Sequence, residues 1–172
     1  LKTKARLMEA FTGKLKDAKG TVLSVEDGIE AVVGDNKHLT QFLKDSITPT
    51  TSSKDLHGLA NFVLATSKDK TSTDFLVTAL SNYKHKATQV LQDTSLTDAQ
   101  KTAKLETDFN ILPKSNSSFD SDYYKQEIDS TIDDVMNYYS DVKEARKNAY
   151  QLLTDEATMS GVSSFFKTEA NL

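Results

Sequence analysis

Apolar residues recur every seven positions along the first 43 residues of the chain. Two apolar series make up this pattern: Met8, Leu15, Val22 and Ile29, and, three positions later, Phe11, Ala18, Val25 and Val32. Such paired series are the a and d positions of a helix that packs along another helix. The pattern therefore predicts one long amphipathic helix over residues 2–33.

Four glycines lie within or directly after this stretch: Gly13, Gly20, Gly28 and Gly34. In the heptad register all four fall outside the a and d positions. Each would weaken the helix by about 1 kcal/mol relative to alanine without opening its packing face. The tripeptide 34–36 (Gly-Asp-Asn) favours a turn, after which residues 37–47 form a further helix. Because Leu39 and Leu43 keep the heptad phase, a helix that continues through this turn is the alternative.

A second long helix is predicted over residues 122–154, again in heptad phase. Its apolar seam consists of Ile128, Ile132, Val135, Tyr139, Val142, Ala149 and Leu153. Arg146 falls on the same seam. It either pairs with a carboxylate, as a buried cation requires, or extends its guanidinium past the edge of the seam into solvent.

Shorter amphipathic patterns occupy the rest of the chain, over residues 54–67, 72–92, 98–110 and 155–170. Ser53 is the expected N-cap of the first of them. Thr97 and Gln100 have the spacing of a capping box, and Pro113 ends the helix that follows them. We therefore predict an all-α fold, a single domain over residues 1–172. It is an elongated helical bundle in which the two long helices pack lengthwise.

The composition supports an all-α fold and argues against β-barrels, membrane-spanning chains and nucleic-acid binders. Two prolines and six glycines are too few for the many turns of a β-barrel or sandwich. The sequence contains no run of about 18 apolar residues, so no transmembrane segment is predicted. The net charge of −4 argues against a nucleic-acid binder.

The charge is unevenly distributed along the chain. Residues 1–86 carry 13 Lys/Arg and 10 Asp/Glu, a net charge of +3, whereas residues 87–172 carry 8 and 15, a net charge of −7. Such polarity favours antiparallel pairing of the molecule's own ends or a partner of matching polarity. The plainer interpretation is that both halves present ordinary solvated faces.

The sequence contains no recognisable motif for catalysis or for binding a metal or cofactor, and we predict a non-enzymatic protein without a metal or a cofactor. The chain has no cysteine, which excludes disulfides and thiolate chemistry. The histidines (His38, His57 and His85) do not have metal-ligand spacing. The acidic stretch 120–144 lacks the glycine that a calcium-binding EF-hand loop needs, so a solvated helix face is the better interpretation.

One candidate surface remains, on the second long helix. It consists of Tyr123, Tyr124, Asp129, Asp133, Asp134 and Tyr138. Aromatic side chains on an acidic helix are typical of protein-recognition patches. The alternative is that the tyrosines cover the edge of the core with their hydroxyls in water.

The sequence thus favours a non-enzymatic helical module that binds a protein partner. One alternative is a carrier of a lipid-like ligand inside the bundle, lined by Phe75, Phe109, Phe165 and Phe166. The other is an assembly protein, a homo-oligomer formed through the first heptad helix.

Three features favour a secreted or cell-surface location over a cytoplasmic one, which is the alternative. They are the abundance of Ser and Thr, the excess of Lys over Arg, and the sequon Asn116-Ser117-Ser118. The chain also starts at Leu1 without an initiator methionine, as either a mature form after signal removal or an excised fragment would.

Overall fold

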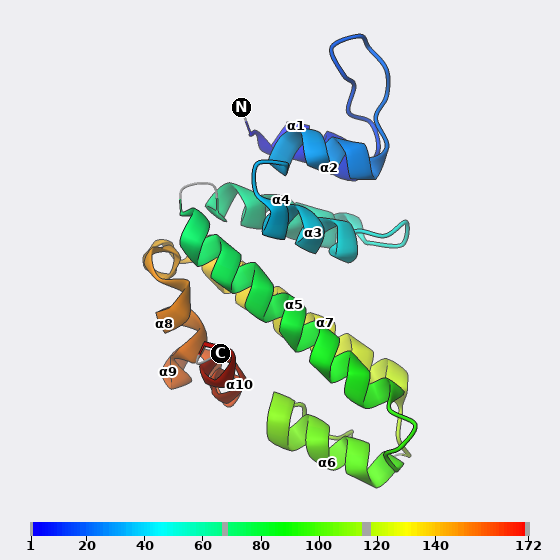
Figure 1. Cartoon of the computed structure of the whole chain (residues 1–172), viewed down its shortest axis with the longest axis vertical. Helices are drawn as coiled ribbons and strands as arrows, with labels where there is room; N and C mark the ends of the chain where they lie inside the picture. Colours follow the sequence, from blue (N-terminus) through cyan, green and yellow to red (C-terminus); the bar gives the residue numbers. More distant parts are fainter. Residues whose placement is uncertain (1, 67–68, 115–117, 171–172) are drawn as a thin grey trace.

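The two longest helices, α5 (Lys70–Gln92) and α7 (Ser121–Asp141), pack along each other in the computed structural model (Figure 1). The structure describes residues 2–66, 69–114 and 118–170. Within these ranges the chain is mostly α-helical, with one 3-10 helix and no strand. The predicted all-α fold is therefore confirmed.

Helices α3 (Lys37–Ser46) and α4 (Ser53–Thr66) cover one end of the α5–α7 pair. Helix α3 packs on α5, and α4 packs on α7. The ring of Phe62 joins these layers, since its centroid lies 5.9 Å from that of Phe42 and 5.8 Å from that of Tyr139.

The other end of α5 carries α6 (Asp98–Phe109), which begins at the predicted capping box. The Thr97 hydroxyl accepts from the Gln100 amide at 3.1 Å, and the Gln100 side chain accepts from the Thr97 amide at 2.8 Å. The N-cap expected at Ser53 lies one residue earlier, because the Ser52 hydroxyl accepts from the Asp55 amide.

The predicted N-terminal helix over residues 2–33 is wrong. The chain forms α1 (Lys4–Phe11) and α2 (Val25–Val33), which pack on each other, and residues 12–24 connect them as a loop. Gly13 and Gly20 adopt φ angles of +69° and +82°, which a right-handed helix does not contain. The Ser24 hydroxyl then caps α2 by accepting from the Asp27 amide.

The turn predicted at residues 34–36 is confirmed, and the continuous alternative is wrong. Helix α2 ends at Val33, and the Asn36 side chain caps α3 by accepting from the Leu39 amide at 3.0 Å. The predicted lengthwise pairing of the first and last long helices is also wrong, because α1 packs on α2 and α4, whereas α7 packs on α4 and α5.

The second long helix is shorter than the predicted 122–154. Helix α7 ends at Asp141, and the chain continues through the 3-10 helix η1 (Lys143–Lys147) into α8 (Ala149–Thr154). Arg146 donates from Nε to the carbonyl of Tyr139 at 3.2 Å and from Nη2 to the carbonyl of Ser140. Its guanidinium therefore closes the last turn of α7, which neither of the two expectations foresaw.

The helix predicted over residues 155–170 is broken at Gly161. Helices α9 (Glu156–Met159) and α10 (Ser163–Ala170) flank that bend, and α10 packs on α5, α6 and α8. Asn116 and Ser117 of the sequon lie outside the described residues. No described helix has both the length and the apolar character that crossing a membrane requires.

Candidate partner-binding groove

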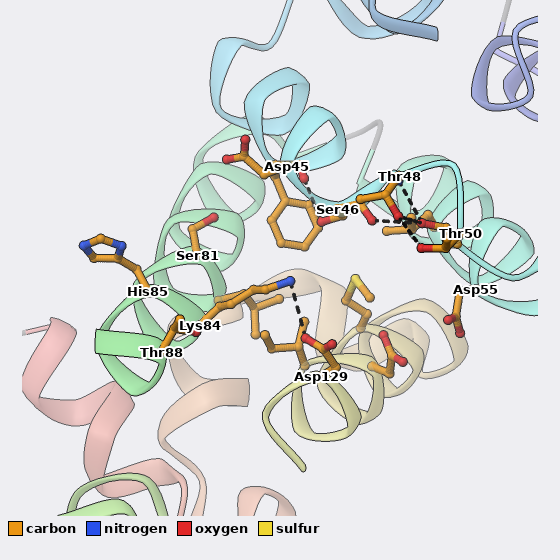
Figure 2. A pocket seen from close by; sticks show the side chains of 17 residues that line it. Asp45, Ser46, Thr48, Thr50, Asp55, Ser81, Lys84, His85, Thr88 and Asp129 are labelled. Carbon is orange, nitrogen blue, oxygen red and sulfur yellow. Dashed lines mark hydrogen bonds and ion pairs between the residues drawn. The ribbon is translucent and has the colours of Figure 1, made fainter. Parts of the chain in front are cut away.

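A hollow of about 540 Å³ lies where α3, α4, α5 and α7 meet, and the α3–α4 loop borders it (Figure 2). We call this hollow the groove. Its floor is apolar and consists of five buried side chains, one or two from each helix: Phe42, Leu59, Leu80, Ile132 and Met136. Ile132 and Met136 share a face of α7 because they are one turn apart, and the packing of α3, α4 and α5 around that face brings the other three side chains to it.

Hydroxyl groups of the α3–α4 loop form one edge of the groove. The Thr51 hydroxyl accepts from the Thr48 amide at 2.9 Å, and the hydroxyls of Thr48 and Thr50 lie 3.1 Å apart. Helix α3 ends at Ser46, and Pro49 disfavours a helical conformation at Thr48, so these local bonds give the loop its shape. This edge can both donate and accept hydrogen bonds.

Carboxylates dominate the rest of the rim. They are Asp45 on α3, Asp55 on α4, and Asp129 and Asp133 on α7. Figure 2 shows the Lys84 side chain reaching from α5 towards Asp129, and their charged atoms lie 3.4 Å apart. With His85 neutral, the lining carries a net charge of −3 when all four carboxyls are ionised.

The surroundings of Asp133 shift the pKa of its carboxyl group. Partial burial, together with the charges of Asp55, Asp129 and Asp134, raises the pKa of Asp133 from 3.8 to about 6, and Lys84 opposes this shift. Taking a carboxyl group out of water beside other anions disfavours its charged form. The groove thus concentrates more negative charge than its single lysine offsets.

The six residues predicted as a partner-binding patch do not form one surface. Asp129 and Asp133 line the groove, and Asp134 is exposed beside it. Tyr124 is only 3% exposed and stacks on Phe119 with centroids 5.1 Å apart.

The two remaining tyrosines are half-buried against the core. The Tyr123 hydroxyl donates to the carbonyl of Leu112 at 2.9 Å, and Tyr138 packs at the other end of α7. At 3.6 residues per turn, Tyr138 lies on the side of α7 opposite to Asp129 and Asp133, whereas Tyr123 lies on a flank of the helix, about 80° from Asp133. The tyrosines therefore pack against the core, as the alternative interpretation has it, but Tyr124 is buried and the Tyr123 hydroxyl bonds to a carbonyl rather than pointing into water.

A second hollow of about 530 Å³ lies between α5, α6 and α10, and it bears on the predicted ligand cavity. Phe109 and Phe165 border it. Phe109, Phe165 and Phe166 surround the buried Tyr83 at centroid distances of 5.7, 5.3 and 6.0 Å. Phe75 instead contacts Tyr150. The four phenylalanines predicted to line one cavity are therefore divided between two places.

Within the described residues, no three or more Asp, Glu and His side chains are arranged to hold a metal ion. The chain matches no protein-family model, no curated protein and no solved structure.

Proposed function

We propose that the protein is a non-enzymatic module that binds a protein partner in the groove, and that the partner presents a cationic, amphipathic segment. One observation carries this proposal: an apolar floor of five side chains is surrounded by Asp45, Asp55, Asp129 and Asp133 and by one lysine. Neither a purely polar nor a purely apolar ligand would satisfy both parts of such a site.

The two parts of the groove have different roles in binding. The apolar floor supplies affinity mainly by taking the partner's apolar side chains out of water, since its own five side chains are already buried. The carboxylates orient the bound segment and raise its association rate, because an anionic rim attracts cationic segments and repels anionic ones. A helix with lysines on one face and leucines on the other has this combination.

The proposed location is the exterior of the cell or its surface. It rests on the Ser/Thr content and the excess of lysine over arginine in the sequence. Fractionation of the native source, with detection by an antibody, tests the location independently of the binding assays.

A fluorescently labelled model helix of leucine and lysine is the appropriate probe for the groove. We expect saturable binding by anisotropy, weakened by salt because the attraction is partly electrostatic. Asp129→Asn/Asp133→Asn should weaken binding about tenfold. The matched control is Glu106→Gln/Asp122→Asn, which removes the same charge from exposed positions on α6 and α7. Equal affinity of the two double variants would contradict the proposal.

The second candidate function is transport of a lipid-like ligand. The hollow beside Phe109 and Phe165 favours it, since both rings offer apolar surface to a ligand there. Mass spectrometry of a denaturing extract of the purified protein tests it. A carrier should release a stoichiometric lipid, and Phe165→Ser should abolish that signal.

A further inference from the structure

The loop between α1 and α2 is an ordered hairpin that projects from the N-terminal end of the molecule (Figure 1). Two main-chain hydrogen bonds pair its arms. The Asp17 amide donates to the Thr21 carbonyl at 2.9 Å, and the Leu23 amide donates to the Leu15 carbonyl at 2.7 Å. Between them Lys16 and Val22 form an antiparallel bridge. We call residues 14–23 the hairpin.

Both ends of the hairpin are fixed to the body, and its tip is locked. Leu15 is only 3% exposed, and Leu23 packs against the core. At the tip, one carboxylate oxygen of Asp17 accepts from the amides of Lys19 and Thr21, both at 2.9 Å. Because the hairpin is already ordered, docking it costs little conformational entropy.

The outer surface of the hairpin is cationic and partly apolar. Lys14, Lys16 and Lys19 are all exposed, and the Val22 side chain beside them is 55% exposed. The only acid in the hairpin, Asp17, directs its carboxylate to main-chain amides of the tip. This combination of lysines and an exposed aliphatic side chain is the chemistry that the groove is proposed to bind.

We propose that the hairpin of one molecule docks into the groove of a second copy of the same chain. This inference rests on the proposed function of the groove and names its partner. Charge complementarity supports it, since the hairpin carries three lysines against one acid and the groove carries four carboxylates against one lysine.

The placement of the two surfaces makes the contact intermolecular. The hairpin points away from α3, α4 and α5, whereas the groove lies among α3, α4, α5 and α7 (Figure 1). A contact between two different surfaces of identical chains is head-to-tail, so it forms either a ring or an open chain of molecules. On this proposal, the homo-oligomer given above as an alternative forms through the hairpin rather than through a heptad helix.

Sedimentation velocity of the full chain at low ionic strength tests the proposal. We expect the weight-average mass to rise with protein concentration and to fall again on addition of salt. Lys16→Glu/Lys19→Glu should abolish the rise. The matched control is Lys37→Glu/Lys70→Glu, which makes the same charge change at exposed positions in the first turns of α3 and α5. A wild-type chain that stays monomeric overturns the proposal.

A charge exchange identifies the acceptor. Asp129→Lys/Asp133→Lys should also be monomeric alone, and mixing it with Lys16→Glu/Lys19→Glu should restore association, because each hairpin then meets a groove of opposite charge. Asp129→Asn/Asp133→Asn provides a milder groove variant if the lysine variant fails to fold. Unchanged self-association of either folded groove variant overturns the proposal, since the hairpin's acceptor would then lie elsewhere.

The leucine–lysine helix separates this inference from the proposed function. If the wild-type chain stays monomeric but binds that helix in the groove, the self-docking inference fails and the groove function stands. If the helix does not bind, while a synthetic peptide of residues 12–24 binds in a manner that requires Asp129 and Asp133, the groove is specific for its own hairpin, and the inference is supported. If neither binds, both proposals fail.

Discussion

Gly28 lies directly against Ala10 where α2 packs on α1. A Cβ atom added to Gly28 would lie 3.2 Å from the Cα atom of Ala10 and 3.3 Å from its carbonyl oxygen. Because these neighbours are main-chain atoms of a helix, they cannot turn aside as a flexible side chain would. The absence of a side chain at Gly28 therefore sets how closely the two N-terminal helices approach.

This contact predicts opposite effects for two Gly→Ala substitutions in helices. Gly28→Ala gains helix propensity but forces α1 and α2 apart, so we expect a net loss of stability of about 1–2 kcal/mol. Gly58→Ala in α4 meets only the Asn137 side chain at 3.8 Å, so it should gain up to about 1 kcal/mol. Urea unfolding of both variants checks this. Equal gains would contradict the tight contact at Ala10.

The heptad pattern of the N-terminal region predicted burial correctly at several positions but not the continuity of the helix. Phe11, Ile29 and Val32 are buried as the seam requires, whereas Ala18 and Val22 are exposed on the hairpin. Two short helices that pack on each other bury the same spacing of apolar residues as one long helix does. The positive φ angles of Gly13 and Gly20 rule out one continuous helix, and a heptad register carries no information about φ.

Gly20→Ala tests this distinction at the hairpin tip. Nothing lies within 4 Å of a Cβ added at Gly20, so the substitution probes only its φ of +82°. We expect a loss of about 1–2 kcal/mol, because an L-residue with a Cβ is strained in that region. Gly20→Asn should lose less, since asparagine tolerates positive φ better. Chemical denaturation measures both, and a stabilising Gly20→Ala would argue for helix at this position.

Arg146 gives a prediction at the C-terminal end of α7. Its guanidinium donates to the carbonyls of Tyr139 and Ser140, which have no partner within the helix. Arg146→Ala should cost about 1–2 kcal/mol, and Arg146→Lys should cost less because it keeps a cation near the helix terminus. Thermal melting compares the three proteins. If the lysine variant were as stable as the wild type, the charge rather than the hydrogen bonds would account for the effect.

Sequence reasoning identified part of the groove and missed the rest for a physical reason. Asp129 and Asp133 were recognisable because they lie one turn apart on a helix rich in acids. Asp45, Asp55 and Lys84 belong to three other helices, and only tertiary packing brings them to the same hollow. The sequence of α7 alone also groups Tyr123, Tyr124 and Tyr138 with these acids, although all three pack against the core.

The pKa of Asp133 predicts how stability depends on pH. The folded protein holds the proton on this carboxyl up to about pH 6, whereas the unfolded chain releases it near the usual value of 3.8. Between these values the folded state binds more protons, so this group lowers stability as pH rises from about 4 to about 6. Asp133→Asn removes that loss. After discounting for the solvent that reaches the side chain, we expect a gain of about 1 kcal/mol at pH 7 and no gain at pH 4.

Urea unfolding at several pH values measures this difference, and Asp122→Asn is the control, because that carboxyl is exposed in the first turn of the same helix. Its effect should be slightly destabilising, since an anion near a helix N-terminus is favourable. An equal gain from Asp133→Asn at pH 4 and at pH 7 would mean that the amide simply packs better. A gain that appears only above pH 5 would show that the ionised Asp133 carboxylate destabilises the folded chain. A destabilising charge of this kind is expected of a carboxylate whose role is to bind a cationic segment.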